Sequence, residues 1–202
     1  MKPWLIVPVK PFNEGKSRLS PALQPAQRAE LSARLLAQTL STAQQSARFA
    51  QIVVVSRDPN VLATARRAAA LGLLEAGTEL NAALEQGCTY ASRAGAQAAL
   101  LLPADLPRLA DTDLHQLVDS FVNFQTAVLA PSRDGGTSAL LLRLPPPFAL
   151  CFGAESFHCH RTQALAAGCS VTVVDTPSLR FDLDSPAELA ELQIRPARPT
   201  GR

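Results

Sequence analysis

The sequence predicts an α/β fold with a mostly parallel sheet, in a single domain. Short apolar runs alternate with segments in which apolar residues recur every three or four positions, which is the pattern of strands alternating with helices. The length of 202 residues suits one core, since a chain of this size buries roughly 70% of its unfolded surface. No repeat or linker divides the chain, so we expect one domain over 1–194 and a disordered tail over 195–202.

The first half of the chain supplies most of the expected parallel strands. Short apolar runs, several rich in β-branched residues, predict strands at 4–9, 51–55, 73–75 and 98–102. Leucines spaced three or four apart predict an amphipathic helix over 25–45, with Pro25 in its first turn. A second helix is expected to begin at Asp58 and Pro59, run to residue 71 and stop at Gly72. A third is expected over 80–94.

The second half continues the alternation. Its expected helices and strands are a helix over 111–124, strands at 127–130 and 139–142, a helix over 154–167, a strand at 171–174 and an extended segment at 179–183. Ser185 and Pro186 provide an N-cap and first turn for a last helix, to residue 192. Sheets of this class bind ligands at the carboxyl ends of their strands, so the loops after the strands are where functional residues are expected.

Composition excludes several classes of function. A formal net charge of +2 without clustered Lys and Arg argues against nucleic-acid binding. The first apolar run is broken by Pro8 and is too short for a signal peptide or a membrane span, so we expect a cytoplasmic protein that does not contact membranes.

The four cysteines, at 88, 151, 159 and 169, have no CxxC spacing and are expected to be free thiols in a reducing compartment. The run His158, Cys159, His160 could suggest zinc. Adjacent residues do not readily converge on one tetrahedral metal, however, and no second ligand pair stands at a usable distance, so structural zinc is not expected.

A cationic loop follows the first strand. Lys10, Lys16 and Arg18 surround Gly15, and three cations at a strand end could hold a triphosphate, with lysine acting as a point charge and arginine as a bidentate fork. The loop could equally be a solvated surface loop. Neither GxxxxGK[ST] nor GxGxxG is present.

Isolated acids follow two other apolar segments. Asp105 stands between two prolines after the run at 98–102, and Asp182 and Asp184 are separated by one residue, which places them on one side of an extended chain. Carboxylates at such positions can bind a divalent cation, because hard cations prefer oxygen ligands. Asp105 as a turn residue and Asp184 as a helix cap are the structural alternatives.

Two further segments are typical of anion-binding loops. Residues 134–138 (DGGTS) and 152–156 (FGAES), the latter followed by His160, combine glycines with hydroxyl side chains near an expected helix start. Glycine lets backbone amides approach a ligand, hydroxyls donate hydrogen bonds, and a helix N-terminus favours negative charge.

Taken together, these segments resemble the 2-phospho-L-lactate guanylyltransferase family, which includes phosphoenolpyruvate and 3-phospho-D-glycerate guanylyltransferases. The resemblance spans nearly the whole chain. It rests on PVKPFNEGKSRLSP at 8–21, LNAAL at 80–84, LPADLP at 102–107, DGGTSALLL at 134–142, FGAESFHCH at 152–160 and FDLDSPAEL at 181–189.

This resemblance implies a Rossmann-like nucleotidyltransferase fold of the GT-A type and a step in coenzyme F-420 biosynthesis. GTP and a small phosphorylated acid would give a guanylylated acid and pyrophosphate, with Mg²⁺ as cofactor. It implies that Asp105, Asp182 and Asp184 bind metal, that Lys10, Lys16, Arg18 and Asn81 bind the nucleotide, that Ser138, Gly153 and Ser156 bind the acid, and that Lys16, Arg18 and Asp105 are catalytic.

Other functions remain open from the sequence. The same fold serves other nucleotidyltransferases, such as molybdenum-cofactor cytidylyltransferases, and a non-catalytic nucleotide-binding module is a further alternative. A homodimer is possible. Cys88, one helical turn after Leu84, would tune which acid fits if that helix face closes the pocket.

Overall fold

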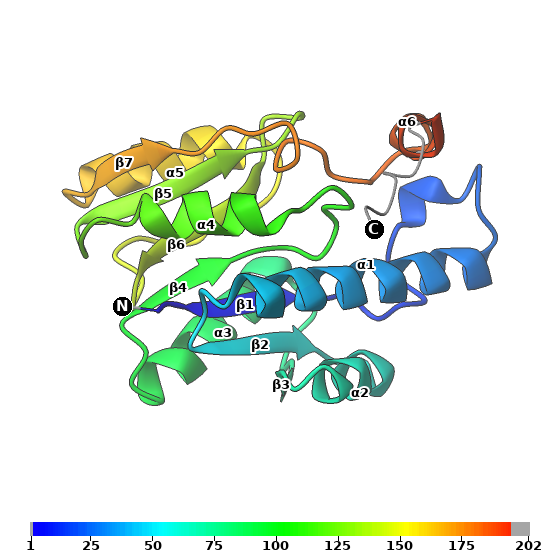
Figure 1. Cartoon of the computed structure of the whole chain (residues 1–202), viewed down its shortest axis with the longest axis horizontal. Helices are drawn as coiled ribbons and strands as arrows, with labels where there is room; N and C mark the ends of the chain where they lie inside the picture. Colours follow the sequence, from blue (N-terminus) through cyan, green and yellow to red (C-terminus); the bar gives the residue numbers. More distant parts are fainter. Residues whose placement is uncertain (1, 195–202) are drawn as a thin grey trace, which may run out of the picture.

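Seven strands form one sheet with helices on both of its faces in the computed structural model, which describes residues 2–194 (Figure 1). The expected α/β fold with a mostly parallel sheet is confirmed. The tail expected to be disordered, 195–202, lies outside the described residues.

The helices and strands follow one another along the chain as the sequence predicts. In order they are β1 (Trp4–Pro8), the 3₁₀ helix η1 (Ser17–Leu19), α1 (Pro25–Ser46), β2 (Gln51–Ser56), α2 (Pro59–Arg67), β3 (Leu71–Leu74), α3 (Leu80–Arg93), β4 (Ala98–Leu101), α4 (Asp111–Asp119), β5 (Thr126–Pro131), β6 (Thr137–Arg143), α5 (Ser156–Ala166), β7 (Ser170–Val173) and α6 (Pro186–Ile194).

The carboxyl ends of nearly all strands lie along the same edge of the sheet. Its strand order is β3-β2-β1-β4-β6-β5-β7, and only β6 runs antiparallel to its neighbours. The carboxyl ends of the six other strands therefore share one edge with the start of β6. A ligand site at that edge would receive the loops that follow β1, β4 and β5.

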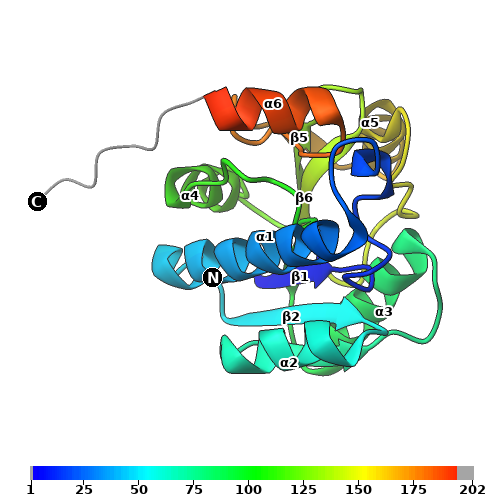
Figure 2. The same cartoon turned by 90° about the vertical axis from the view of Figure 1, so that its right-hand side faces the viewer.

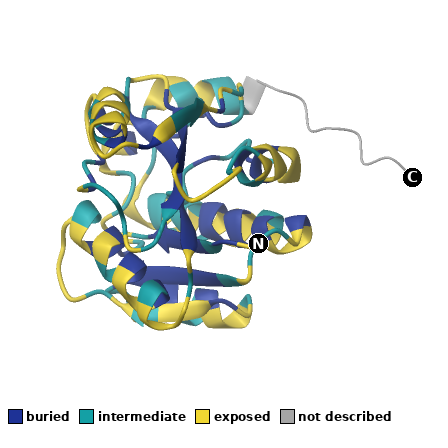
Figure 3. Ribbon diagram, turned by 90° about the vertical axis from the view of Figure 1, so that its left-hand side faces the viewer, coloured by how far each residue is buried: buried dark blue, intermediate teal, exposed yellow. Residues whose placement is uncertain are grey.

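Alternate residues of the central strands face two separate cores. Leu5 and Val7 of β1 pack with α1, α2 and α4, whereas Ile6 packs with α3 and α5. Figure 2 shows these two helix layers on opposite sides of the sheet, and Figure 3 shows buried strands between helices with exposed outer faces. The apolar runs lack a polar face because helices cover both sides of each central strand.

A third, smaller cluster holds α6 against the start of the molecule. It contains Leu19 of η1, Leu35 of α1, Leu183 just before α6 and Leu189 within α6. The expected cap of α6 is confirmed, because the Glu188 N–H donates to Ser185 Oγ at 3.4 Å and the Ser185 N–H donates to the Glu188 carboxylate at 2.7 Å.

Two predicted helix ends were wrong. The helix expected to reach residue 71 ends at Arg67, because Leu71 pairs with Val53 and the segment through Leu74 becomes the edge strand β3. The helix expected to reach residue 124 ends at Asp119. The extended segment at 179–183 forms no strand, yet its alternation is real, since Leu179, Phe181 and Leu183 are all buried.

Gly87 is a position at which α3 lies tightly against the sheet. A Cβ added there would lie 2.6 Å from Ile6 Cγ2 and 3.2 Å from Val55 Cγ2. Both methyls sit on β-branched carbons, which have few rotamers available for relief. We expect Gly87→Ala to lower the free energy of unfolding by about 1–3 kcal/mol despite alanine's better helix propensity.

Chemical denaturation measures this effect, with Gly77→Ala as the matched control. A Cβ at Gly77 has no neighbour within 4 Å, so that variant should stay within about 0.5 kcal/mol of the parent. If Gly87→Ala were as stable as the parent, the close approach of α3 to β1 and β2 would be incorrect.

Candidate active site

A cavity of about 430 Å³ opens at the edge of the sheet where the parallel strands end. Its walls come from the loops after β1 and β4, the β5–β6 hairpin, the segment before α5 and the segment before α6. Of the ten predicted site residues, nine line it; these are Lys10, Lys16, Arg18, Asp105, Ser138, Gly153, Ser156, Asp182 and Asp184. The sheet topology therefore unites segments that lie far apart in the sequence.

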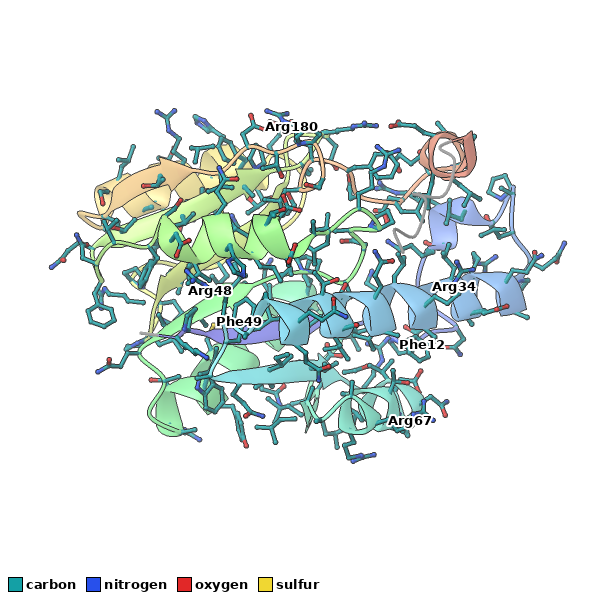
Figure 4. The ribbon with its side chains drawn as sticks, viewed as in Figure 1. Phe12, Arg34, Arg48, Phe49, Arg67 and Arg180 are labelled. Atoms are coloured by element: carbon teal, nitrogen blue, oxygen red, sulfur yellow. A yellow bond between two sulfur atoms is a disulfide. The ribbon has the colours of Figure 1, made fainter. Side chains whose placement is uncertain are left out.

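The loop after β1 is tied to α2. The backbone N–H of Phe12 donates to the Asp58 carboxylate at 3.0 Å, and the same carboxylate caps α2 by accepting from the Asn60 N–H at 2.8 Å. Figure 4 labels Phe12 toward the end of the sheet where β2 finishes and Phe49 toward the end where β2 begins. Asp58 thus fixes the cationic loop as well as a helix start.

Lys16 is the most constrained cation of the site. Its backbone is left-handed, with φ 54°, and its side chain is 9% exposed. Its Nζ lies 2.9 Å from Asp184 Oδ1 and 3.5 Å from Asp105 Oδ2. Burial alone would lower the pKa of Lys16, but the two carboxylates outweigh it and raise the pKa above its ordinary value. Lys16 is therefore a fixed ammonium.

Lys10 and Arg18 lie exposed at the rim of the same cavity. The cationic loop is thus part of the cavity wall rather than a solvated loop elsewhere on the surface. With one ammonium fixed inside and two cations at the mouth, this wall suits a polyanion.

The acids form a second group on the cavity wall. Burial first, and then the nearby carboxylates of Asp105, Asp134 and Asp184, raise the pKa of Asp182 to about 6. Hydrogen bonds from Ser132, and then from the Gly136 N–H, hold the pKa of Asp134 below its usual range.

The three predicted metal ligands are not gathered into a closed cage. Within residues 2–194, no three His, Cys, Asp or Glu side chains are arranged so that they could hold a metal ion together. Lys16 lies between Asp105 and Asp184 instead. Carboxylate oxygens are nevertheless suitable donors for Mg²⁺, which commonly takes one or two carboxylates and completes its shell with water and substrate phosphate.

Hydroxyl groups of β6 and α5 line another part of the cavity, the hydroxyl-lined end. Ser138, predicted to bind the acid, donates to the backbone oxygens of Pro131 at 3.0 Å and Ala130 at 3.3 Å. Ser156 donates to Thr137 Oγ1 at 3.2 Å. Space is open at Gly153, where an added Cβ would have no neighbour within 4 Å.

His160 lies beneath the hydroxyl-lined end and contacts residues on either side of it. It is fully buried, and its Nε2 accepts a hydrogen bond from the Cys151 N–H at 3.0 Å, while its Nδ1 lies 2.9 Å from Thr137 Oγ1. The Phe152 ring meets the imidazole edge to face at 4.7 Å between centroids. Burial lowers the pKa of His160 to about 4, so the ring is neutral near pH 7.

Two residues that the sequence analysis connected with the pocket, Asn81 and Cys88, do not line the cavity. Asn81 was expected near the nucleotide, but its amide bonds both backbone groups of Phe152, at 2.8 and 3.1 Å, and it does not line the cavity. It fastens α3 to the segment before α5. Cys88 was expected to tune the pocket, but it is 1% exposed within the α3 core, where burial raises its thiol pKa to about 12.

The expectation of four free cysteines was wrong for two of them. Cys151 and Cys159 form a disulfide, whereas Cys88 and Cys169 are free and buried. The chain turns back between the pair through Gly153, at φ 143°, and Glu155, at φ 54°, which brings their Cα atoms to 6.7 Å. Sequence spacing alone does not reveal such a turn. His158 is exposed and His160 buried, so the two imidazoles face different surroundings.

None of the helices described for residues 2–194 combines the length and apolar character needed to cross a bilayer.

Comparison of the sequence with known families and proteins gives a consistent result. The family described as "Guanylyl transferase CofC like" matches residues 3–198. A phosphoenolpyruvate guanylyltransferase of Rubrobacter xylanophilus is 42% identical over 98% of this chain and 100% of its own length. A 2-phospho-L-lactate guanylyltransferase of Methanothermobacter thermautotrophicus is 34% identical over 95% of this chain and 84% of its own.

Solved structures show the same fold at much lower identity. A nucleotide-diphospho-sugar transferase from Desulfovibrio desulfuricans has a TM-score of 0.73 at 16% identity, covering 99% of this chain and 90% of that one. A 4-diphosphocytidyl-2C-methyl-D-erythritol synthase from Anaerococcus prevotii has a TM-score of 0.62 at 11% identity, covering 95% and 96%. These likenesses confirm the nucleotidyltransferase type of fold.

The crowded carboxylates make stability depend on pH in a predictable direction. The pKa of Asp182 is about 6 when folded and near 3.8 when unfolded, so the folded state binds more protons between these values and stability falls as the pH rises through them. Asp182→Asn removes the ionisable carboxylate and with it this loss of stability at high pH. We expect it to raise the free energy of unfolding at pH 7.5 by roughly 1 kcal/mol, after allowance for partial exposure, with no gain near pH 3.5.

Thermal denaturation at several pH values without divalent cations measures the effect, and Asp175→Asn is a control of opposite sign. A hydrogen bond from Arg180 holds the pKa of Asp175 low, so that carboxylate favours the folded state at high pH. An Asp182→Asn protein no more stable than the parent at pH 7.5 would show that Asp182 is not under this repulsion.

Proposed function

The chain belongs to the CofC-like guanylyl transferase family, and we propose that it transfers GMP from GTP to a small phosphorylated three-carbon acid, with release of pyrophosphate. It is a nucleotidyltransferase. The observation that supports the finer proposal is that one cavity is lined by all of these groups. They are the fixed ammonium of Lys16, the exposed cations at the rim, the carboxylates and the hydroxyl-lined end. Phosphoenolpyruvate is the acid we propose first, because the relative that is 42% identical is named for it.

The reaction needs little covalent chemistry from the protein. A phosphate oxygen of the acid attacks the α-phosphorus of GTP, a new P–O bond forms, and the bond to the β-phosphate bridging oxygen breaks, so that pyrophosphate leaves with that electron pair. Phosphate is already ionised at neutral pH, so no base has to remove a proton. The protein must mainly align two anions that repel each other and stabilise negative charge in the transition state.

The cavity divides naturally between the two substrates. We assign Lys10, Lys16 and Arg18 to the triphosphate, because they are cations on one wall. We assign the hydroxyl-lined end, with Gly153 and Ser156, to the acid. Ser138 lines the same end, but its proton is engaged by β5 carbonyls, so it is left to accept rather than donate.

We further propose Mg²⁺ as the cofactor, held by carboxylates among Asp105, Asp182 and Asp184 together with phosphate oxygens. The raised pKa of Asp182 among neighbouring carboxylates supports this, since a cation would relieve that repulsion. When bound, the ion would neutralise phosphate charge and orient the leaving group. Lys16, which contacts Asp105 and Asp184, would help to stabilise the same charge.

The proposal also places the protein in coenzyme F-420 biosynthesis, where a guanylylated acid supplies the side chain of the deazaflavin. The activated acid joins two phosphates through an anhydride, so it would be consumed by a transferase that attaches the phospho-acid half to an acceptor and releases GMP.

Substrate profiling tests the proposed activity. The protein is incubated with Mg²⁺, each of the four nucleoside triphosphates, and phosphoenolpyruvate, 3-phospho-D-glycerate or 2-phospho-L-lactate, and pyrophosphate release is measured. We expect GTP to be preferred, phosphoenolpyruvate to give the highest kcat/KM, and EDTA to abolish turnover. Preference for CTP would indicate a cytidylyltransferase, and no turnover with any pair while GTP binds would indicate a non-catalytic module.

Lys16 should act on the GTP side of the reaction. We expect Lys16→Ala to raise KM for GTP by about tenfold or more and KM for the acid by less than about twofold, because it removes one charge-assisted contact of about 1.5–3 kcal/mol. Lys2→Ala, at an exposed position outside the cavity wall, is the control and should match the parent. A raised acid KM with unchanged GTP dependence would place the cationic loop on the wrong substrate.

A further inference from the structure

One part of the cavity wall has no substrate group assigned to it by the proposed function. It contains Glu75, which directly follows β3, together with Thr78, Leu80 and Ala83 in the connection to α3 and its first turn. In the sheet, β3 lies two strands from β1, on the side away from β6. We call these four residues the β3 end of the cavity.

Glu75 places a buried carboxylate at this end. Its side chain is 6% exposed, and Arg57 Nη1 lies 3.8 Å from its Oε2, which is too long for a hydrogen bond. The other guanidinium nitrogen of Arg57 is bonded to Glu14, which also lines the cavity. Arg57 therefore holds two carboxylates at this part of the wall.

The Glu75 carboxylate has acceptor capacity that the protein leaves unused. Within residues 2–194 no side chain donates a hydrogen bond to it, and its backbone contact is with the Arg57 N–H. Burial raises the pKa of Glu75, whereas the charge and the backbone N–H of Arg57 lower it. A carboxylate accepts at two oxygens, so a ligand that donates to both would offset the loss of hydration.

The charge of this end selects the kind of group that fits. Glu75 and Glu14 would repel a triphosphate, so the β3 end suits a neutral group that donates hydrogen bonds. Guanine carries two donors side by side, N1–H and the 2-amino group, which match the two oxygens of one carboxylate. Adenine and cytosine place a donor beside an acceptor, and uracil has one N–H between two carbonyl oxygens, so a carboxylate favours guanine over the other three bases.

The ribose hydroxyls also donate, but the position of Glu75 favours the base. Neighbouring strands lie about 4.8 Å apart, so the end of β3 is roughly 10 Å from the end of β1, where the cationic loop begins. The ribose is joined directly to the α-phosphate and must lie beside that loop, whereas the base extends further. Leu80 and Ala83 supply apolar contacts for the face of a ring.

We propose that Glu75 determines the nucleotide specificity, by accepting hydrogen bonds from N1–H and the 2-amino group of the guanine of GTP. This inference rests on the function proposed above and names the residue that makes GTP the preferred nucleotide. The base lies at the β3 end, the triphosphate beside the loop after β1, and the acid at the hydroxyl-lined end near β6. The substrates thus follow the order of the strands in the sheet.

Three purine nucleotides test the contact, because they differ at the carbon next to N1. GTP has an amino group at C2, ITP a hydrogen and XTP a carbonyl oxygen. Binding of each is measured by calorimetry with Mg²⁺ and without acid. We expect the parent to bind GTP about tenfold or more tightly than ITP, which lacks one donor to a charged acceptor, and to bind XTP more weakly still.

Glu75→Gln should reverse the preference between GTP and XTP. The Gln amide oxygen still accepts from N1–H, while its NH₂ group donates to the C2 carbonyl of XTP and opposes the 2-amino group of GTP. We expect the ratio of GTP to XTP affinity to fall by about 100-fold. Because both ligands are compared in one preparation, the ratio does not depend on the fraction of the variant that is folded.

Glu79→Gln is the matched control. Glu79 is an exposed acid in the same connection, outside the cavity wall, so its variant should keep the parent's ratio to within about twofold. An unchanged ratio in Glu75→Gln would overturn the inference. So would a loss shared equally by GTP, ITP and XTP but absent for 2′,3′-dideoxy-GTP, since that pattern would place the ribose on Glu75.

The binding measurement separates this inference from the proposed reaction. If Glu75→Gln shifts the ratio, the inference holds even where no guanylyl transfer is detected. If the parent transfers GMP to an acid while Glu75→Gln keeps the ratio, the inference fails and the proposed function stands.

Discussion

The ammonium of Lys16 between Asp105 and Asp184 is the contact on which the candidate site depends. It joins the loop after β1, the loop after β4 and the segment before α6, which are separated by up to 168 positions in the sequence. A backbone hydrogen bond supports the same junction, since the Leu183 N–H donates to the backbone carbonyl oxygen of Asp105 at 3.0 Å. Without this cation, Asp105, Asp182 and Asp184 would face one another with only repulsion between them.

The same contact explains why the site suits a phosphate-transfer reaction. Under the proposed function, a divalent cation would bind these carboxylates together with substrate phosphate. The binding of that cation would relieve the repulsion between carboxylates that raises the pKa of Asp182 in the folded protein. Burial of apolar side chains in the two cores on either side of the sheet offsets this destabilising repulsion.

The acid end of the cavity is organised by hydrogen-bond direction rather than by charge. A backbone N–H sets the tautomer of His160, the tautomer sets the orientation of Thr137, and the β5 carbonyls engage Ser138. Asn81 and the Cys151–Cys159 pairing hold the segment that carries Gly153 and Ser156. Apart from Asn81, which the resemblance assigns to the nucleotide, none of these supporting residues was expected to touch substrate, and together they hold the hydroxyl groups in place.

The sequence by itself determined the α/β class, nearly all strands, the cationic loop and the acids that line the cavity. These follow from local rules, because apolar runs and turn residues act over a few positions and because parallel strands end on one edge. It also identified a family through motifs spread along the chain.

Only the tertiary structure decided the rest. Leu71 belongs to a strand because of Val53, Asn81 serves a loop 71 positions away, and Cys151 meets Cys159 through a turn that spacing does not reveal. Ser138 and Thr137 carry adjacent hydroxyls, yet Ser138 donates to the backbone of β5 whereas Thr137 pairs with His160 and Ser156. Hydrogen-bond direction depends on partners that are distant in sequence, and for that reason it appears only once the chain is folded.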